Sequence, residues 1–104
     1  MMKSIGVILR PYGSLSYAVG EGGVVEIRNI VVCSEHRREG IGRKLLEKLK
    51  SKCSKDIYTV FAFCREENRI GRQWYDAMGF CLYHLPDFYG KGENAYCCTL
   101  SLSK

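Results

Sequence analysis

Apolar residues recur along this chain in short runs whose spacing predicts strands near both ends and helices between them. Residues 4–10, 15–19 and 24–33 are rich in Val, Ile and Leu, and turns that contain glycine separate them. Residues 57–64 are almost all apolar or β-prone, which is typical of a strand buried on both faces of a sheet. We therefore expect three consecutive strands and a fourth in the middle of the same sheet.

Two stretches carry apolar residues at helical spacing, one over residues 41–52 and one over residues 68–78, where Gly79 follows as a stop. The apolar face of the first helix consists of Ile41, Leu45, Leu46, Leu49 and Cys53. The apolar face of the second consists of Ile70, Trp74, Ala77 and Met78. Each helix is expected to pack that face on the sheet.

The last part of the chain predicts two more strands, over residues 82–85 and 95–102, with Pro86 ending the first and residues 87–94 forming a loop. The resulting order is β-β-β-α-β-α-β-β, an α/β domain with a mixed sheet. Its strand–helix–strand unit over residues 24–64 is expected to pair as a right-handed parallel crossover. We expect the 104 residues of the chain, 1–104, to form a single domain.

Composition and charge narrow the class of protein. The hydrophobic content of 46% suits a packed core, and no apolar run approaches the ~20 residues that span a bilayer. Because Arg10 and Pro11 interrupt the first apolar run, we expect no signal peptide and a cytoplasmic protein. The net charge of +5 lies largely around residues 37–55, which suits an anionic cofactor. A nucleic acid ranks below it, because aromatic residues are not interleaved with the basic run.

Six cysteines raise the question of a zinc site or of disulfides. None forms a Cys-x-x-Cys pair, and His36 and His84 are not at zinc-finger spacing. Small buried residues in a reducing compartment are the simpler interpretation, with no metal, although a disulfide in a thermophile's cytoplasm stays open. The cysteines are Cys33, Cys53, Cys64, Cys81, Cys97 and Cys98.

The turn between residues 33 and 41 has the clearest chemistry. Arg37, Arg38, Gly40 and Gly42 stand where a helix begins, and the first N–H groups of a helix are unpaired and partly positive. Glycines let a phosphate approach the backbone, so the turn predicts a pyrophosphate site. It is neither a P-loop, since no Gly-Lys-Ser/Thr follows, nor a dinucleotide fingerprint, since Leu45 stands where a third glycine belongs. The plain alternative is a tight turn with solvated arginines.

The motif Arg37-x-x-Gly40-x-Gly42, between a strand and an amphipathic helix, resembles the acyl-CoA-binding signature of the GNAT superfamily of N-acetyltransferases, Gln/Arg-x-x-Gly-x-Gly/Ala. Together with the two motifs that follow, the resemblance spans residues 24–102. It implies a GNAT-like mixed β-sheet flanked by helices, with acetyl-CoA as the cosubstrate.

Two further stretches carry the same resemblance. The run Asn68-x6-Tyr75-x3-Gly79-Phe80 is similar to the Asn…Tyr…Gly-Phe stretch of many GNAT proteins. The ending, Phe88-Tyr89 followed by residues 93–96, looks like the last hairpin of the RimI-like protein N-terminal acetyltransferases.

The resemblance also implies roles for individual residues. Asn68 would hydrogen-bond the pantetheine arm, and Tyr75 would protonate the leaving thiolate. The third strand would splay from its neighbour and offer backbone groups to the acetyl and pantetheine portions, while the turn would hold the pyrophosphate. These positions are Val31, Val32 and Cys33 in the strand, and Arg37, Arg38, Glu39, Gly40, Ile41, Gly42 and Arg43 in the turn.

Direct attack of an amine on a thioester needs a base, and Glu26 is the leading candidate. It matches the glutamate that serves as base in the histone-acetylating branch of the superfamily. The RimI-like branch instead carries a glutamate on its fifth strand, at a position that is Phe63 here, so this chain departs from that subgroup. His84 is an alternative base.

The family usually begins with a strand and two helices that form one wall of the acceptor site. Only three strands precede the signature turn here, so we expect that wall to be missing and either a homodimer or an open groove in its place. The expected reaction is acetyl transfer from acetyl-CoA to a primary amine, on a protein N-terminus, a lysine or a small molecule. The alternative is a non-catalytic acyl-CoA-binding sensor or assembly module of the same fold.

Overall fold

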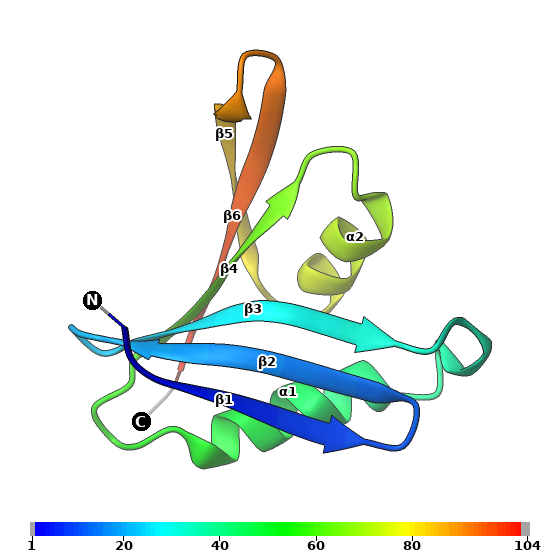
Figure 1. The fold of residues 1–104 in the computed structure, drawn as a ribbon, viewed down its shortest axis with the longest axis vertical. Coiled ribbons are helices and arrows are strands. Elements are labelled where there is room, and N and C mark those ends of the chain that lie inside the picture. The colour runs from blue at the N-terminus through cyan, green and yellow to red at the C-terminus, as the bar shows by residue number, and fades with distance from the viewer. Residues whose placement is uncertain (1, 103–104) are drawn as a thin grey trace.

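The computed structural model describes residues 2–102, which form a six-stranded sheet and two helices (Figure 1). The order β-β-β-α-β-α-β-β is confirmed, with one short 3-10 turn, η1, added before the first helix. The elements are β1 (Met2–Arg10), β2 (Gly13–Gly20), β3 (Val24–Val32), η1 (Ser34–His36), α1 (Ile41–Lys52), β4 (Thr59–Arg65), α2 (Arg69–Ala77), β5 (Cys81–Gly90) and β6 (Glu93–Ser101).

The strands lie in the order β1-β2-β3-β4-β6-β5, and β3 with β4 is the parallel pair among antiparallel neighbours. This confirms the parallel crossover through α1. The β3–β4 pairing is short, because it runs from Val24 opposite Thr59 only to Glu26 opposite Phe61. Beyond that point the two strands diverge, and Figure 1 shows β4 turning away from β3. We call this opening the fork.

Both helices pack on one face of the sheet, where the core lies. The prediction for α1 is confirmed, since Leu45, Leu46 and Leu49 are at most 1% exposed. They pack against strand residues such as Leu15 and Val60, which are fully buried. Alternation along each strand turns every second side chain toward this core.

The prediction for the buried face of α2 is wrong in part. Ile70 is 61% exposed, Ala77 is also exposed, and Tyr75 is buried instead. The reason is where the helix rests on β4. A Cβ added to Gly71 would lie 3.1 Å from the Sγ of Cys64, so Gly71 faces the sheet and Ile70 beside it faces solvent.

The opposite face of the sheet, which we call the open face, is covered by no helix among residues 2–102. On β1 the side chains of Ile5, Val7 and Leu9 are 77%, 59% and 76% exposed, whereas Ile8 between them is 4% exposed. Figure 1 views this side of β1 to β3, with α1 behind them.

The prediction for the last hairpin is wrong, because β5 continues through Pro86 as far as Gly90 and the turn is only two residues long. β5 lies at the edge of the sheet, where the missing N–H of a proline breaks no ladder. The register shifts between Leu85 and Gly90, which makes this stretch a bulge, and Asp87 within it has a left-handed φ of 57°.

None of the six cysteines, all of which lie within residues 2–102, is in a disulfide. Cys64 and Cys98 are buried as predicted, but Cys33 and Cys81 are exposed, so the expectation of uniformly buried cysteines is wrong. In the part of the chain that the structure describes, no cluster of three His, Cys, Asp or Glu side chains is placed to hold a metal ion. No helix there is long and apolar enough to cross a membrane.

Candidate functional site

The turn before α1 presents a set of unpaired backbone N–H groups. Gly40 is the N-cap of α1, with a left-handed φ of 79°, and no side chain caps the helix. The first helical bond runs from the N–H of Lys44 to the carbonyl of Gly40 at 3.0 Å. The N–H groups of Gly40 through Arg43, which we call the cradle, have no acceptor within residues 2–102. Such a helix start binds anions.

The two glycines of the signature are required for different reasons. Glycine suits position 40 because of its left-handed backbone and not because of space, since a Cβ there would meet nothing within 4 Å. Gly42 is buried, and a Cβ on it would lie 2.5 Å from Nε1 of Trp74. The sequence predicted a phosphate-related role for both. The structure shows that Gly42 lets α2 pack against the start of α1.

Contacts with the preceding hairpin hold the turn in place. The ring of His36 stacks on Tyr12, with the ring centroids 3.6 Å apart. His36 also lies 3.1 Å from the carboxylate of Glu39, and the N–H of Cys33 donates to the carbonyl of Tyr12 at 2.7 Å. A turn fixed from one side leaves its other side available for a ligand.

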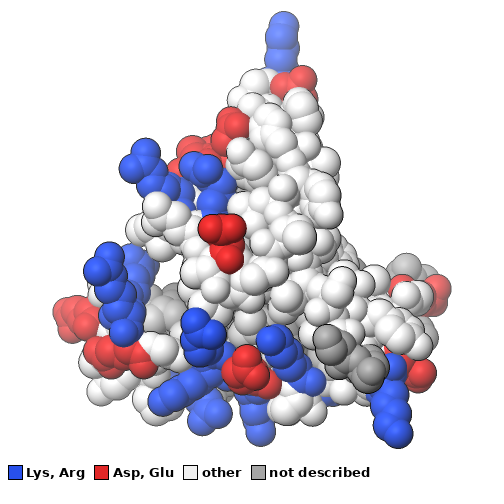
Figure 2. All heavy atoms as spheres, turned by 180° about the vertical axis from the view of Figure 1, so that it is seen from behind, with Lys and Arg blue, Asp and Glu red and all other residues white. Residues whose placement is uncertain are grey.

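Three arginines of the turn are exposed and form no ion pair with any described residue. They are Arg37, Arg38 and Arg43. Beyond them, lysines along α1 add to the positive surface, and Figure 2 shows basic side chains gathered over the lower part of the molecule. The cradle therefore lies in a positive field that attracts phosphates.

The fork lies at the same end of the sheet as the cradle, because the turn follows directly from β3. From Ile27 to Val32, β3 has β2 on one side and, among residues 2–102, no strand on the other. The predicted cofactor positions Val31 and Val32 lie on this free edge, and Cys33 follows them. Backbone groups that lack a strand partner are available to an extended, amide-bearing ligand.

Glu26 lies at the base of the fork and on the open face. It occupies the last β3 position that pairs with β4, opposite Phe61. Its Oε1 accepts a hydrogen bond from Nε of Arg28 at 2.7 Å, and its side chain is 14% exposed. The carboxylate is therefore partly buried and paired, not plainly exposed, and its role as a base stays a prediction.

Tyr75 lies on the helix side of the sheet and is 6% exposed. Its ring meets those of Trp74 and Phe80 edge to face, at centroid distances of 5.0 and 5.1 Å. Burial raises the pKa of Tyr75 well above its ordinary value, and the nearby thiols of Cys98 and Cys64 add to the shift. The phenol is therefore held in its protonated, hydrogen-bond-donating form.

Asn68 has a structural role that the resemblance did not indicate. Its Oδ1 accepts a hydrogen bond from the N–H of Gly71 at 3.0 Å, which makes Asn68 the N-cap of α2. The signal for this was an asparagine immediately before a helical run. The amide nitrogen of Asn68, Nδ2, has no hydrogen-bond partner among the described residues.

The structure brings the cradle and the end of β3 together, and it places Glu26 and Tyr75 on opposite sides of the sheet near the fork. His84 lies apart from this site, because β6 separates its strand from β4. Its Nε2 is 2.8 Å from the Oε2 of Glu66. The alternative assignment of His84 as a base at the fork therefore has no support in the geometry.

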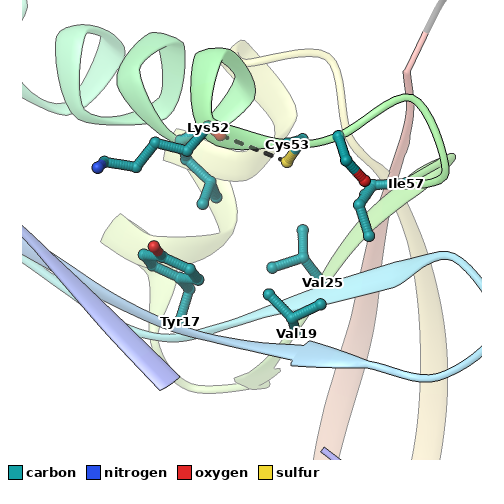
Figure 3. A pocket seen from close by; sticks show the side chains of 8 residues that line it. Tyr17, Val19, Val25, Lys52, Cys53 and Ile57 are labelled. Atoms are coloured by element: carbon teal, nitrogen blue, oxygen red, sulfur yellow. Dashed lines mark hydrogen bonds between the residues drawn. The ribbon is translucent and has the colours of Figure 1, made fainter. Parts of the chain in front are cut away.

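A small hollow of about 220 Å³ lies between the C-terminal end of α1 and the sheet (Figure 3). Its lining is mainly apolar, with Tyr17, Val25 and Cys53 among the residues that point into it. It is at the end of α1 away from the cradle and does not belong to the candidate site.

The chain resembles known proteins in sequence and in fold. The sequence model of the acetyltransferase (GNAT) family matches residues 5–80. No curated protein matches the chain.

Solved structures share the fold at low sequence identity. Ard1 from Thermoplasma volcanium has a TM-score of 0.76 at 23% identity, over 89% of this chain and 64% of its own. The ribosomal-protein-S18-alanine N-acetyltransferase from Escherichia coli has a TM-score of 0.71 at 24% identity, over 89% and 63%. A GNAT family acetyltransferase from Elizabethkingia anophelis, with acetyl-CoA bound, has a TM-score of 0.73 at 17% identity, over 88% and 69%. The chain thus spans less than two thirds of the first two proteins.

Proposed function

This chain belongs to the GNAT family of acetyltransferases, and from the geometry of its site we propose that it transfers an acetyl group from acetyl-CoA to a primary amine. The proposal rests on two features that lie next to each other at one end of the sheet. The cradle offers unpaired N–H groups, and the fork beside it exposes a free edge of β3. The first suits a pyrophosphate and the second suits the pantetheine arm.

The cofactor would lie along these features in order. The pyrophosphate accepts hydrogen bonds from the N–H groups of Gly40 through Arg43, and the guanidinium groups of Arg37, Arg38 and Arg43 add charge. The pantetheine amides pair with the free edge of β3 near Val31 and Val32, with the amide of Asn68 as a further partner. This order brings the thioester into the fork.

The acceptor would reach the thioester from the open face, where Glu26 lies. The amine nitrogen attacks the thioester carbonyl and forms the new C–N bond, and the C–S bond then breaks. Glu26 takes a proton from the amine, and Tyr75 donates one to the thiolate from the helix side. The products are an acetylated amine and CoA with a free thiol. After the transfer, Glu26 releases its proton to solvent and Tyr75 takes one up, so both groups return to their starting states.

The acceptor class includes protein N-termini, lysines and small amines. One comparison favours a protein N-terminus, because the Escherichia coli enzyme of similar fold is named as an N-acetyltransferase for an alanine of ribosomal protein S18. We also propose that the chain forms a homodimer.

The test has two parts, binding and turnover. Trp74 is the only tryptophan and touches the start of α1, so its fluorescence reports binding of acetyl-CoA at the cradle. Release of CoA thiol in the presence of primary amines then reports transfer. Binding without amine-dependent thiol release would support the non-catalytic alternative, and an absence of binding would overturn both.

Glu26→Gln separates chemistry from binding. We expect kcat to fall by about 10²–10⁴-fold, the usual contribution of a general base, with the affinity for acetyl-CoA retained. Glu21→Gln, in the exposed turn before β3, is the matched control and should keep full turnover. Equal kcat for Glu26→Gln and wild type would remove Glu26 from the mechanism.

A further inference from the structure

We infer that four aromatic side chains on the open face recognise the acceptor, and that they select amines carrying an uncharged aromatic or large apolar group. The four, which we call the aromatic ladder, are Phe61, Phe63, Phe88 and Tyr89. The inference rests on the proposed function, because it concerns the acceptor of the same reaction.

The rings form a continuous series from the fork to the tip of the hairpin. Phe61 and Phe63 meet edge to face with centroids 5.7 Å apart. Phe63 stacks on Phe88 at 4.7 Å with an interplanar angle of 24°, and Phe88 meets Tyr89 edge to face at 5.0 Å. These are favourable aromatic geometries, so the ladder is an ordered surface.

Ordered rings of this kind are normally buried, but here they face solvent. Phe63, Phe88 and Tyr89 are 38%, 45% and 39% exposed, whereas Phe80 in the core is 4% exposed. A contiguous apolar surface that is both exposed and rigid is typical of a ligand-binding site.

The bulge of β5 is what carries Phe88 onto Phe63. Regular pairing stops at Leu85 opposite Ala95 and resumes at Gly90 opposite Glu93. Between them Asp87 takes a left-handed backbone, which aspartate adopts more readily than most residues other than glycine. Bulges re-aim side chains, and this one turns Phe88 toward Phe63.

Hydrogen bonds fix the bulge in this shape. Oδ1 of Asn94 accepts from the N–H of Asp87 at 2.8 Å, and Oδ1 of Asp87 accepts from the N–H of Gly92 at 2.7 Å. Nδ2 of Asn94 donates to Oε1 of Glu66 at 3.0 Å, and Glu66 also contacts His84. Asn94 is thus a positioning residue, which joins the end of β4 to the bulge.

The distal end of the ladder is also anchored. The guanidinium of Arg65 lies 4.1 Å from the ring centroid of Tyr89, and its Nη1 is 3.5 Å from Oε1 of Glu93. Arg65 therefore covers one ring and is itself neutralised. The four side chains of the ladder themselves carry no charge.

The proximal end of the ladder lies beside the candidate base. Phe61 is the β4 partner of Glu26 in the sheet, and adjacent strands are about 4.8 Å apart. An amine held at Glu26 therefore extends its substituent along the ladder. An aromatic or branched aliphatic group gains ring contacts there, and a charged group loses its hydration without a partner.

The test compares two primary amines, 2-phenylethylamine and ethylamine, with acetyl-CoA. We expect the wild type to show at least about tenfold higher kcat/KM for the aromatic amine, and Phe88→Ala to reduce that ratio about tenfold. Asn94→Ala should lower the same ratio, whereas a merely structural loss would lower both amines together. Tyr58→Ala is the matched control, because Tyr58 is 57% exposed but precedes the other end of β4.

A ratio near one in the wild type, or a ratio that Phe88→Ala leaves unchanged, would overturn the inference while leaving the proposed function intact. If neither amine is acetylated, these two amines give no ratio of kcat/KM, and binding decides the inference alone. Saturation-transfer NMR with the CoA complex should then show 2-phenylethylamine bound to the wild type and released in Phe88→Ala. Equal signals for the two amines, or no signal, would overturn it.

Discussion

Gly42 and Trp74 lie so close that a single methyl group cannot fit between them, since a Cβ on Gly42 would be 2.5 Å from Nε1 of Trp74. Gly42 lies in the first turn of α1 and Trp74 belongs to α2, so this contact joins the cradle to the helix that carries Tyr75. The two signatures of the family are therefore coupled physically. The cradle and the helix that carries the candidate acid share this packing contact.

Gly42→Ala tests this contact. Overpacking at such a site destabilises a protein by about 1–3 kcal/mol, and the better helix propensity of alanine returns about 1 kcal/mol. We expect a net loss and a melting temperature lower by several degrees, measured by circular dichroism. The double variant Gly42→Ala with Trp74→Phe should recover part of the loss, because the smaller ring leaves room. Additive effects of the two substitutions would show that the side chains are not coupled.

Cys33 provides a chemical probe of the cofactor site. It is exposed at the end of β3, directly before the turn, and Cys81 is exposed on β5 away from the cradle. We expect iodoacetamide to label both in the free protein, and CoA to slow labelling of Cys33 about tenfold or more without protecting Cys81. Mass spectrometry of the digested protein gives both rates. Equal protection of the two cysteines, or of neither, would contradict the proposed cofactor position.

The buried thiols should behave differently in the same experiment. Burial raises the pKa of Cys98 to about 12, with the thiols of Cys64 and Cys97 adding to the shift, and burial also raises the pKa of Cys64. Since the thiolate is the reactive form, neither should react in the folded protein at pH 8, and both should react in urea. Labelling of Cys98 in the folded protein at a rate similar to Cys33 would contradict its burial.

Glu66 links the stability of the hairpin to pH. Hydrogen bonds from Asn94 and with His84 hold the pKa of Glu66 below its ordinary value of 4.5. A lowered pKa means that the ionised group stabilises the folded state above its unfolded pKa and loses this effect as the pH falls through the folded pKa. Glu66→Gln should therefore reduce the urea midpoint at pH 7, and the difference from wild type should shrink below pH 4.5. Glu67→Gln, on the neighbouring exposed residue, is the control. A difference that is constant from pH 7 to pH 3 would contradict this assignment.

The fold followed from local patterns, and the errors lie where distant residues decide. The helical periodicity of α1 and the β-prone run of β3 are each visible in a stretch of about ten residues. The ends of both elements were predicted to within one residue. That Pro86 is tolerated depends on β5 being an edge strand, which no local pattern reports. Which face of α2 is buried depends on Gly71 meeting β4, again a tertiary contact.

The candidate site shows the same division. The cradle was predictable, because a helix start exposes N–H groups whatever surrounds it. The position of Glu26 at the base of the fork was not, since it depends on where β3 and β4 part. The aromatic ladder was also missed as a unit, because Phe63 and Phe88 meet only through the bulge.

The β1 half of the open face leads to the last prediction, the homodimer. Ile5, Val7 and Leu9 form an exposed apolar row on an edge strand, and their partners on β2 on the same face, such as Ser14 and Ser16, carry no charge. An uncharged apolar surface packs against the same surface of a second copy without local charge repulsion, even in a chain of net charge +5. Each such side chain contributes about 1.5–3 kcal/mol when it is buried. We expect sedimentation equilibrium to show a dimer at micromolar concentration and Leu9→Glu to shift it to monomer, with Lys48→Glu on α1 as the control. A wild type that stays monomeric at high concentration would mean that this row is not an interface between copies.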